Sequence, residues 1–496
     1  MNTQVMDEVG ANQQQDWFVR WLENNETKLL KNKGLQRVAL SYAEHTLKAN
    51  AKENLEVKKD QPPGVIRDRL SMGMAILESV KTALNEYDLC ESTLNALSNI
   101  VIKEMFLNKS LRKEKSVQFR EEHGFVTPSF IVISPSKACN LRCTGCYADS
   151  NEKVYTLDWD LVNQIVKDAR ELWGTQFVVV SGGEPLAYRS KGKTILDIAE
   201  QNPDTFFMMY TNGTLIDDKV AAQMAKLGNV LPAISLEGWR EKTDQRRGEG
   251  VFDQVMAAMD RLQAAGVPYG TSLTATRQNA EEILSDDFIE FLFKEKHVVI
   301  GWVFQYMPIG RAFTTNLMPT PEQRLGMWQQ SWKLIREKRT FLADFWNHGT
   351  VVDGCLSAGG HNNGGYFYID WNGNVTPCVF VPFSPVNVND IYSRGGNLNT
   401  IYDAPFFQRI RNWQKDDCDG NLLMPCLIRD HHKDLRHFIR DYEPDAIDSN
   451  AELTLIDPDY AIAMDQYAED YRSLSEPIWE QVYLEGDPPE LDTILS

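Results

Sequence analysis

The sequence predicts an α/β fold with a parallel sheet, because short apolar runs alternate with helical patterns through the middle of the chain. Six runs rich in β-branched and other apolar residues are bounded by turn residues, at positions 130–134, 177–181, 206–211, 230–235, 269–276 and 298–306. Amphipathic helical patterns lie between them, as at 157–173 and 252–266, and the second ends at Gly266 and Pro268, a typical helix stop. Strands that alternate with helices form βα units and pair in parallel.

Helical regions are expected on both sides of this core. Residues 1–127 show amphipathic helical patterns, which Pro62, Pro63 and Gly64 interrupt. Segment 94–115 combines an apolar face with five basic residues; such a helix packs on its own protein, which we favour, or lies on an anionic membrane surface. Residues 441–496 hold sixteen acidic residues and one arginine, yet they also carry Tyr460, Tyr467, Tyr471, Trp479 and Tyr483 at partly helical spacing. Acidic disordered tails are poor in aromatic residues, so docked helices are expected here.

Bulk properties narrow the class of protein. A chain of 496 residues can bury a large core and form two or three structural units. Its net charge of −19 disfavours nucleic acid as a partner. No apolar run approaches the length needed to span a bilayer, and the first residues lack the basic and apolar regions of a signal peptide. Seven of the eight cysteines fall in two patterns, which favours a reducing cytoplasm.

The most informative pattern is a group of three cysteines, Cys139, Cys143 and Cys146, in the segment ACNLRCTGCY. Their spacing, C-x3-C-x2-C, places three thiolates in one short loop, where they can hold three corners of a four-iron cluster. No fourth cysteine lies nearby, so one iron would stay open to another ligand. A structural zinc site normally uses paired C-x2-C hooks, and a disulfide framework needs an oxidising compartment. The cluster is therefore favoured over both.

The sequence at this point resembles the radical S-adenosylmethionine (SAM) superfamily, whose signature is C-x3-C-x-φ-C with an aromatic φ. Behind the cysteines, after an apolar run, stands FVVVSGGEPL with Gly182, Gly183, Glu184 and Pro185. In that family the GGEP segment hydrogen-bonds the amino group of SAM. Glycines allow close approach of the backbone to a ligand, and a carboxylate pairs with an ammonium. The resemblance covers roughly residues 128–430 and implies a (β/α)6 partial TIM barrel.

One position departs from the family pattern. The φ position holds Gly145 rather than an aromatic residue, so the contact that helps to seat the adenine is in doubt. Tyr147, or another ring, is a candidate to replace it.

Further SAM-pocket residues are expected at the carboxyl ends of the strands, where barrel sites lie. The resemblance implies polar residues after the third and fourth strands, which here are Thr211, Asn212, Ser235 and Glu237. Arg247, or its neighbour Arg246, is a candidate to meet the SAM carboxylate. Surface arginines in a solvated loop are an equally good interpretation of those two.

The remaining cysteines form a second pattern that resembles the SPASM or shorter twitch extension of radical SAM enzymes. Cys355 precedes GYFYIDWNGNVTPC, in which Gly373-x4-Cys378 follows an Asn372-Gly373 hairpin turn. Cys418 and Cys426 come later. A full SPASM domain has seven cysteines and two clusters, so the four here imply one auxiliary cluster. Cys418 is the weakest candidate ligand, because it lies in a polar stretch; His431 and His432 are possible substitutes, although a solvated helix start explains them more simply.

These patterns predict four regions: helical 1–127, a radical SAM partial barrel at 128–340, a SPASM/twitch-like region at 341–440 and an acidic helical tail at 441–496. Cys90 stands alone in a helical pattern and reads as a buried apolar residue.

The resemblance implies an enzyme with an open-iron 4Fe-4S cluster, a second 4Fe-4S cluster and SAM. Reductive cleavage of SAM would produce a 5′-deoxyadenosyl radical that abstracts hydrogen from an unactivated C–H bond, and the auxiliary cluster would assist oxidation or bond formation. The expected substrate is a peptide or protein side chain, or a lipid or other apolar molecule, and the electron donor a flavodoxin or ferredoxin. Two alternatives are an iron–sulfur electron-transfer or scaffold protein without SAM chemistry, and a zinc protein.

Overall fold

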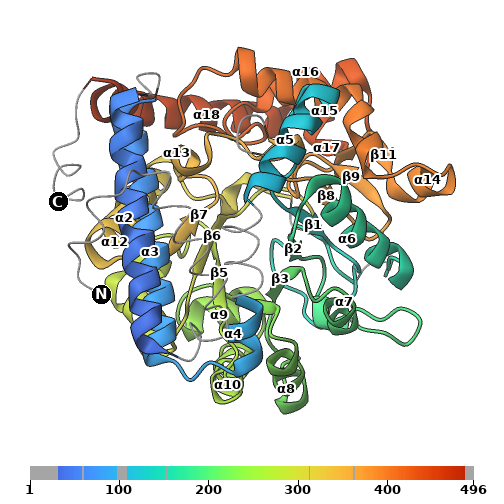
Figure 1. Cartoon of the computed structure of the whole chain (residues 1–496). Helices are drawn as coiled ribbons and strands as arrows, with labels where there is room; N and C mark the ends of the chain where they lie inside the picture. Colours follow the sequence, from blue (N-terminus) through green and yellow to red (C-terminus); the bar gives the residue numbers. More distant parts are fainter. Residues whose placement is uncertain are drawn as a thin grey trace.

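The computed structural model describes residues 32–57, 61–97, 109–151, 154–311, 313–360, 364–448 and 450–485. At its centre is a ten-stranded sheet in the order β11-β9-β8-β1-β2-β3-β4-β5-β6-β7 (Figure 1). The strands, in chain order, are β1 (Ile131–Ile133), β2 (Phe177–Val180), β3 (Phe206–Thr211), β4 (Val230–Leu236), β5 (Gly270–Ala275), β6 (Gly301–Gln305), β7 (Leu342–Asp344), β8 (Tyr368–Ile369), β9 (Asn374–Thr376) and β11 (Val386–Asn387).

Strands β1 to β7 pair in parallel in sequence order, which confirms the parallel α/β fold. All six predicted strands are present. The sequence interpretation missed β7, which has three residues and is too short to produce an alternating pattern. The result is the partial barrel that the sequence predicts, lengthened at both edges.

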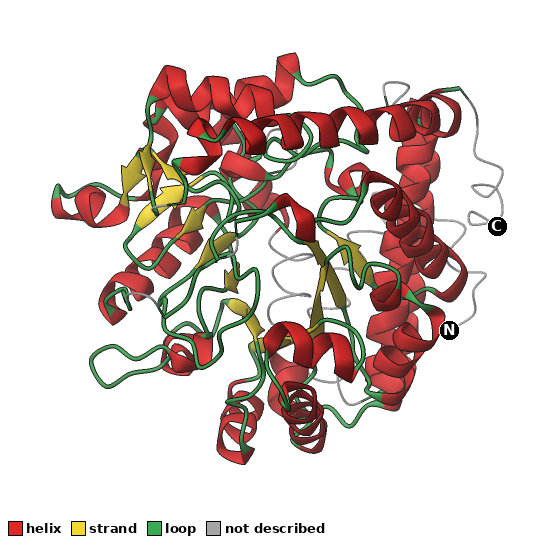
Figure 2. Ribbon diagram, turned by 180° about the vertical axis from the view of Figure 1, so that it is seen from behind, coloured by secondary structure: helices red, strands yellow, loops and turns green. Residues whose placement is uncertain are grey.

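Helices connect the parallel strands and cover the outside of the sheet, as Figures 1 and 2 show. The first of them, α6 (Trp159–Trp173), begins where the Asp158 side chain accepts a hydrogen bond from the Asp160 N–H and ends at the left-handed Gly174. The other connecting helices are α7 (Ile195–Gln201), α8 (Asp218–Leu227), α9 (Arg240–Arg247), α10 (Val251–Ala264), α11 (Asp286–Glu290) and α12 (Pro321–Lys338).

The C-terminal extension continues the barrel sheet. β8 pairs in parallel with β1 and antiparallel with β9, and the turn between β8 and β9 contains Gly373 at a φ of +85°. The predicted hairpin is therefore confirmed. The helices of this region are α13 (Gly349–Val352), α14 (Val388–Ser393), α15 (Pro405–Asn412) and α16 (His432–Tyr442), and β10 (Phe383–Ser384) pairs with β12 (Asp445–Ala446).

The N-terminal region is helical wherever it is described, with α2 (Lys33–Val57), α3 (Pro63–Glu86), α4 (Glu91–Leu97) and α5 (Lys109–His123). The Pro62-Pro63 break predicted from the sequence separates α2 from α3, and Pro63 is the first residue of α3. Residues 98–108, the middle of the predicted basic amphipathic segment 94–115, lie outside the described residues. Figure 1 shows α3 beside β6 and β7.

The acidic tail forms the docked helices α17 (Leu453–Ile456) and α18 (Pro458–Ile478), followed by a π-helical turn (Trp479–Leu484). The five aromatic residues noted in the sequence are buried there: Tyr460, Tyr467, Tyr471, Trp479 and Tyr483. No helix among the residues that the structure describes is both long and apolar enough to cross a lipid bilayer.

Asp68 of α3 joins the N-terminal helices to the rest of the protein. Its carboxylate is fully buried and accepts hydrogen bonds from Arg336 of α12 (2.6 Å), Thr350 of α13 (2.8 Å) and the Tyr483 hydroxyl (2.7 Å). One carboxylate therefore connects four segments that lie far apart in the sequence.

Substituting Asp68→Ala is expected to lower the free energy of unfolding by about 3 kcal/mol, because it leaves the buried charge and donors around it without their acceptor. Anaerobic urea unfolding measures the change. Asp253→Ala is the matched control: Asp253 forms an exposed ion pair with Arg240, so its loss should cost at most about 1 kcal/mol. Equal losses in the two variants would contradict the role of Asp68.

Candidate functional site

The three cysteines of the first pattern lie in the loop between β1 and α6 and face a single cavity. Cys139, Cys143 and Cys146 all line it, together with Gly182 and Gly183 at the end of β2. The pKa of Cys139 is raised to about 11 by burial, and the other two thiols add to this effect electrostatically. Because burial favours the neutral thiol, a cation is needed to hold these sulfurs as thiolates.

The backbone of the GGEP segment holds this loop in place. The Gly183 N–H donates to the Ser136 carbonyl (2.9 Å) and the Glu184 N–H to the Ala138 carbonyl (2.7 Å). The approach is so close that a Cβ on Gly183 would lie 2.1 Å from the Ala138 oxygen. Glycine is therefore required at 183 by contact with the cysteine loop.

The Glu184 side chain has a different position from the one that a direct ligand would take. It is buried, and its carboxylate accepts from the Leu186 N–H (3.0 Å), the Thr211 hydroxyl (2.7 Å) and the Asn212 N–H (2.8 Å). The cavity is lined by Gly182 and Gly183 instead. Glu184 thus ties β2 to β3, and Pro185 begins the short helical turn η3 (Pro185–Ala187) that follows.

Asn212 and Ser235 line the cavity, as the sequence analysis expects of them. The Asn212 amide donates to the Asn140 side chain (2.9 Å), inside the cysteine loop. The end of β3 therefore supports the loop that carries the cysteines.

Tyr147 supports the glycine turn. Its hydroxyl accepts from the Gly182 N–H (3.1 Å) and lies 2.6 Å from the Ser181 hydroxyl. Ser181 and Gly182 directly follow β2, so Tyr147 connects the cysteine loop to the end of that strand.

The absence of an aromatic side chain at 145 has a structural explanation. Gly145 has a φ of +67°, and a Cβ there would lie 2.5 Å from the ring of Tyr306, which follows β6. Tyr306 also lines the cavity. A ring from another strand thus occupies the space beside Gly145, and the sequence interpretation did not identify it.

Three charged residues form a compact group at the ends of β4 and α9. Glu237 is buried and pairs with Arg246 (2.6 Å) and Arg247 (2.5 Å). Two guanidinium groups against one carboxylate leave a net positive charge, and both arginines line the cavity. Such a group suits an anionic ligand. Arg246 also bonds to the Thr144 carbonyl (3.2 Å), inside the cysteine loop.

Arg311 is a second residue that the sequence interpretation missed. Its backbone N–H donates to the Cys146 carbonyl (2.9 Å) and its guanidinium to the Cys143 carbonyl (3.1 Å) and to Asp149 (3.1 Å). It closes the far side of the cysteine loop. Its only signal in the sequence is its place a few residues after the predicted strand at 298–306.

The four later cysteines lie together, with three of them around Cys355. The thiols of Cys378, Cys418 and Cys426 each interact electrostatically with that of Cys355. Burial raises the pKa of Cys378 to about 12 and of Cys418 to about 11, and it also raises that of Cys426. Cys355, Cys378 and Cys426 line a second, smaller cavity. Four sulfurs in one place, one from a buried cysteine and three from partly buried ones, match the donor set of an iron–sulfur cluster.

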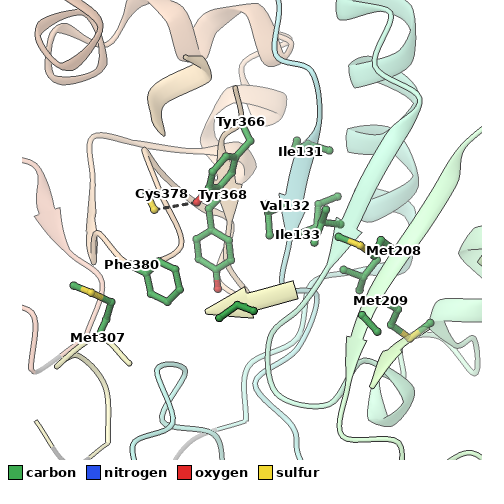
Figure 3. Close-up of a cluster of buried hydrophobic side chains, with 14 of the residues drawn as sticks. Ile131, Val132, Ile133, Met208, Met209, Met307, Tyr366, Tyr368, Cys378 and Phe380 are labelled. Atoms are coloured by element: carbon green, nitrogen blue, oxygen red, sulfur yellow. Dashed lines mark hydrogen bonds between the residues drawn. The ribbon is translucent and has the colours of Figure 1, made fainter. Parts of the chain in front are cut away.

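The polar groups around these cysteines are ordered. The Tyr366 hydroxyl lies 2.9 Å from the Cys378 sulfur, and Figure 3 shows the two side chains directed toward each other. The Cys426 N–H donates to Asp430 (3.0 Å), and Asp430 forms a fully buried ion pair with Arg324 of α12.

The two candidate histidines differ. A ring nitrogen of His431 lies within 4.8 Å of the Cys418 sulfur and of an Asp419 oxygen, while its Nε2 is 2.8 Å from the Met424 carbonyl. His432 is buried against Arg436, and burial lowers its pKa to about 3. Cys90 contacts Ser92 and Thr93 and belongs to neither group.

Two family models match the chain. The radical SAM superfamily model matches residues 133–286, and the SPASM model, an iron–sulfur cluster-binding domain, matches residues 361–433. The chain is a radical SAM enzyme with a SPASM domain.

Curated relatives of this radical SAM enzyme are named as maturases or maturation proteins and as heme synthases. It is 28% identical to the mycofactocin maturase MftC of Mycolicibacterium smegmatis over 59% of this chain and 75% of the relative. It is 26% identical to an AdoMet-dependent heme synthase of Methanosarcina barkeri over 53% of this chain and 80% of the relative. The sporulation killing factor maturation protein SkfB of Bacillus subtilis is 26% identical over 51% and 60%.

Two solved structures share the fold. Streptococcus suis SuiB bound to S-adenosylmethionine aligns with a TM-score of 0.51 and 18% identity over 64% of this chain and 77% of SuiB. The protein anSMEcpe with bound AdoMet aligns with a TM-score of 0.50 and 17% identity over 74% and 98%.

The two domains imply two 4Fe-4S clusters and SAM as cofactors, and the described residues fit them. Three thiols face the larger cavity, a number that leaves one iron of a four-iron cluster open, and the arginine pair lines the same cavity. Four thiols meet at the second site, which suits a fully ligated cluster.

Substituting Gly183→Ala is expected to displace the cysteine loop and remove about half of the iron, because its Cβ would overlap the Ala138 carbonyl. Iron analysis and electron paramagnetic resonance of the anaerobic protein measure this. Gly326→Ala is the control, since a Cβ there meets open space. A Gly183→Ala variant with full iron content would contradict the contact.

Replacing Cys418 tests its membership of the second group. We expect Cys418→Ala to lose the auxiliary cluster, about half of the iron, while Cys90→Ala retains all of it. Full iron in Cys418→Ala but not in the Cys418→Ala, His431→Ala double variant would instead identify His431 as the ligand.

Proposed function

We propose that this enzyme cleaves SAM reductively at the cluster held by Cys139, Cys143 and Cys146 and functionalises an unactivated C–H bond of its substrate. The observation that carries the proposal is the convergence on one cavity of three thiols, the Gly182 and Gly183 backbone and the arginine pair. An electron-transfer protein would need the thiols and not the other two features.

The residues have separate tasks in this proposal. The backbone at Gly182 and Gly183 contacts the amino group of SAM, while Glu184 and Thr211 hold that backbone in position. Arg247, with Arg246 beside it and Glu237 behind both, binds the SAM carboxylate. Tyr306, the ring beside Gly145, replaces the missing aromatic residue next to the adenine. Asn212 and Ser235 complete the wall.

When bound, the reduced cluster and SAM supply a carbon-centred radical that can remove hydrogen from an unactivated carbon. The protein must exclude water and present one hydrogen. The lumen of the barrel does both, because it lies directly below the cysteine loop and is enclosed by the strands.

The auxiliary cluster is assigned to Cys355, Cys378, Cys418 and Cys426. With four cysteine ligands it has no open iron, so it would receive or supply electrons rather than bind the substrate. The two cavities share the lining residues Phe345 and Phe380, whose rings are 6.0 Å apart. The auxiliary site is therefore next to the reaction chamber. A flavodoxin or ferredoxin in a reducing cytoplasm is the proposed electron source.

The names of the relatives support an organic substrate and agree with peptide chemistry: MftC and SkfB are named as maturases, and another relative as a heme synthase.

A deuterium-transfer screen tests the proposed function. Reduced enzyme and SAM are incubated with peptide, lipid and polar-metabolite fractions from cells grown in deuterated medium, and the 5′-deoxyadenosine is examined by mass spectrometry. Deuterium in the product with one fraction is the expected result. Cluster-replete enzyme that forms no 5′-deoxyadenosine would favour the electron-transfer protein.

A further inference from the structure

A single cavity of about 430 Å³ extends from the cysteine loop and the arginine pair into the lumen of the barrel. Alternate residues of the parallel strands point into it, for example Phe177 and Val179 of β2 and Trp302 and Phe304 of β6. Their neighbours Val178, Val180 and Val303 are buried on the opposite face. Closed parallel barrels fill their interior with layers of side chains. Here the inward side chains leave a chamber that extends the site of the proposed reaction.

The polarity of this chamber changes with depth. The mouth carries the cysteines, the arginine pair, Ser181 and Asn212. Below it the wall is largely aliphatic and aromatic, as the following lining residues show: Phe130, Val132, Phe177, Val179, Met208, Trp302, Phe304, Phe341, Ala343 and Phe345. Along β2, Phe177 lies four residue steps below Ser181, which corresponds to a depth of about 13 Å at the usual rise per residue of a strand.

The polar groups below the mouth are few. Hydroxyls come from Tyr210, Tyr366, Ser272 and Thr274. The Tyr366 hydroxyl is paired with Cys378 and the Gln305 amide with Arg429, while the Trp302 indole N–H has no partner among the described residues. The acidic and histidine side chains that line the cavity, Asp344 and His348, are already engaged, and the described residues add no further charge below the arginine pair. Asp344 accepts from the Trp346 and Asn347 N–H groups (both 3.0 Å).

His348 is a neutral part of the wall. Its Nδ1 accepts from the Asp344 N–H (3.0 Å), its Nε2 lies 3.0 Å from the Ser331 hydroxyl, and burial lowers its pKa to about 3. It therefore offers no charge to a ligand at neutral pH.

Helix α3 closes the side of the chamber. Met72 and Ile76 line it, and Ser79, one turn further on, donates to the Val299 carbonyl ahead of β6. Asp68, one turn before Met72, holds the helix against α12 and α13. The N-terminal helices thus contribute another apolar wall to the reaction chamber.

This chemistry selects against a peptide backbone. An amide placed below the mouth without a hydrogen-bond partner would lose its hydration without replacement, and the apolar wall supplies few partners. A hydrocarbon chain loses no hydrogen bonds there and is stabilised by its removal from water. Core packing is the other explanation for these apolar residues. It would require them to fill the lumen, and they leave a cavity there instead.

We propose that the chamber binds the hydrocarbon chain of an amphiphilic lipid, either fatty acyl or isoprenoid, and that this chain bears the C–H bond that reacts. The proposal rests on the proposed function for the reaction and on the chamber for the substrate class. The polar head of the amphiphile stays at the mouth or outside.

Binding of cis-parinaric acid, a fluorescent fatty acid, tests the substrate class separately from turnover. Full-length enzyme with both clusters and SAM should bind it saturably. Displacement by stearic acid identifies a fatty acyl chain, and displacement by geranylgeraniol alone an isoprenoid chain. A blocked hexapeptide of valine, tyrosine and glycine should not compete.

Ala343→Trp fills the chamber and should weaken binding of the probe at least about tenfold. Ile462→Trp, on the exposed face of α18, is the matched control and should change it by no more than about twofold. Iron content and SAM binding show whether each variant is folded, and Ala343→Leu replaces Ala343→Trp if the larger residue prevents folding.

Two results would overturn the lipid assignment: no saturable binding of the probe by enzyme that cleaves SAM, or displacement by the peptide and by neither hydrocarbon. Probe binding that Ala343→Trp leaves unchanged would also overturn it, because the bound chain would then lie elsewhere. Failure to cleave SAM, whatever the probe does, refutes the proposed function instead.

Discussion

Gly183 lies against the backbone of Ala138, and this contact determines where the three cysteines of the first site stand. Two backbone hydrogen bonds accompany it, from Gly183 to Ser136 and from Glu184 to Ala138. The loop is then secured from its other sides by Tyr147, by Arg246 and by Arg311. The long loop between β1 and α6 would otherwise have many conformations, at a large cost in entropy on ordering. Each later feature of the site presupposes that this loop is ordered.

The two cysteine sites are mechanically connected. Arg429 follows Cys426 by three residues, is fully buried, and donates to the Tyr306 carbonyl (2.6 Å). The Tyr306 ring in turn lies beside Gly145 in the first cysteine loop. On the outer side, Arg324 pairs with Asp430 and stacks on Tyr471 of α18 at 3.8 Å. The acidic tail therefore covers the ion pair that orders the second site, and buried charges of this kind require such complete pairing.

Between the sites lies an aromatic layer formed by Phe304, Phe345, Trp346 and Phe380. Their ring centroids are 5.0–6.4 Å apart in successive pairs. Figure 3 shows Phe380 and Cys378 on the side of the auxiliary site, opposite Val132 and Met208 of the barrel. This layer separates the open lumen from the second cysteine group. The proposed division of labour, with substrate on one side and electron transfer on the other, follows from this arrangement.

The sequence alone determined the features that depend on local pattern. The spacing of Cys139, Cys143 and Cys146, the glycines before Glu184, six parallel strands and the hairpin turn at Gly373 are all encoded within a few residues of one another, so periodicity and turn chemistry reveal them. Tertiary structure decided the contacts between distant segments. The Tyr306 ring beside Gly145, the approach of Cys418 to Cys355, the inward turn of Glu184 toward β3 and the hydrogen bonds of Asp68 each join residues that no local pattern relates. The same holds for the chamber, because aromatic residues in a strand pattern look alike whether they fill a core or line a space. Only the packing of the strands against α3 leaves that space open.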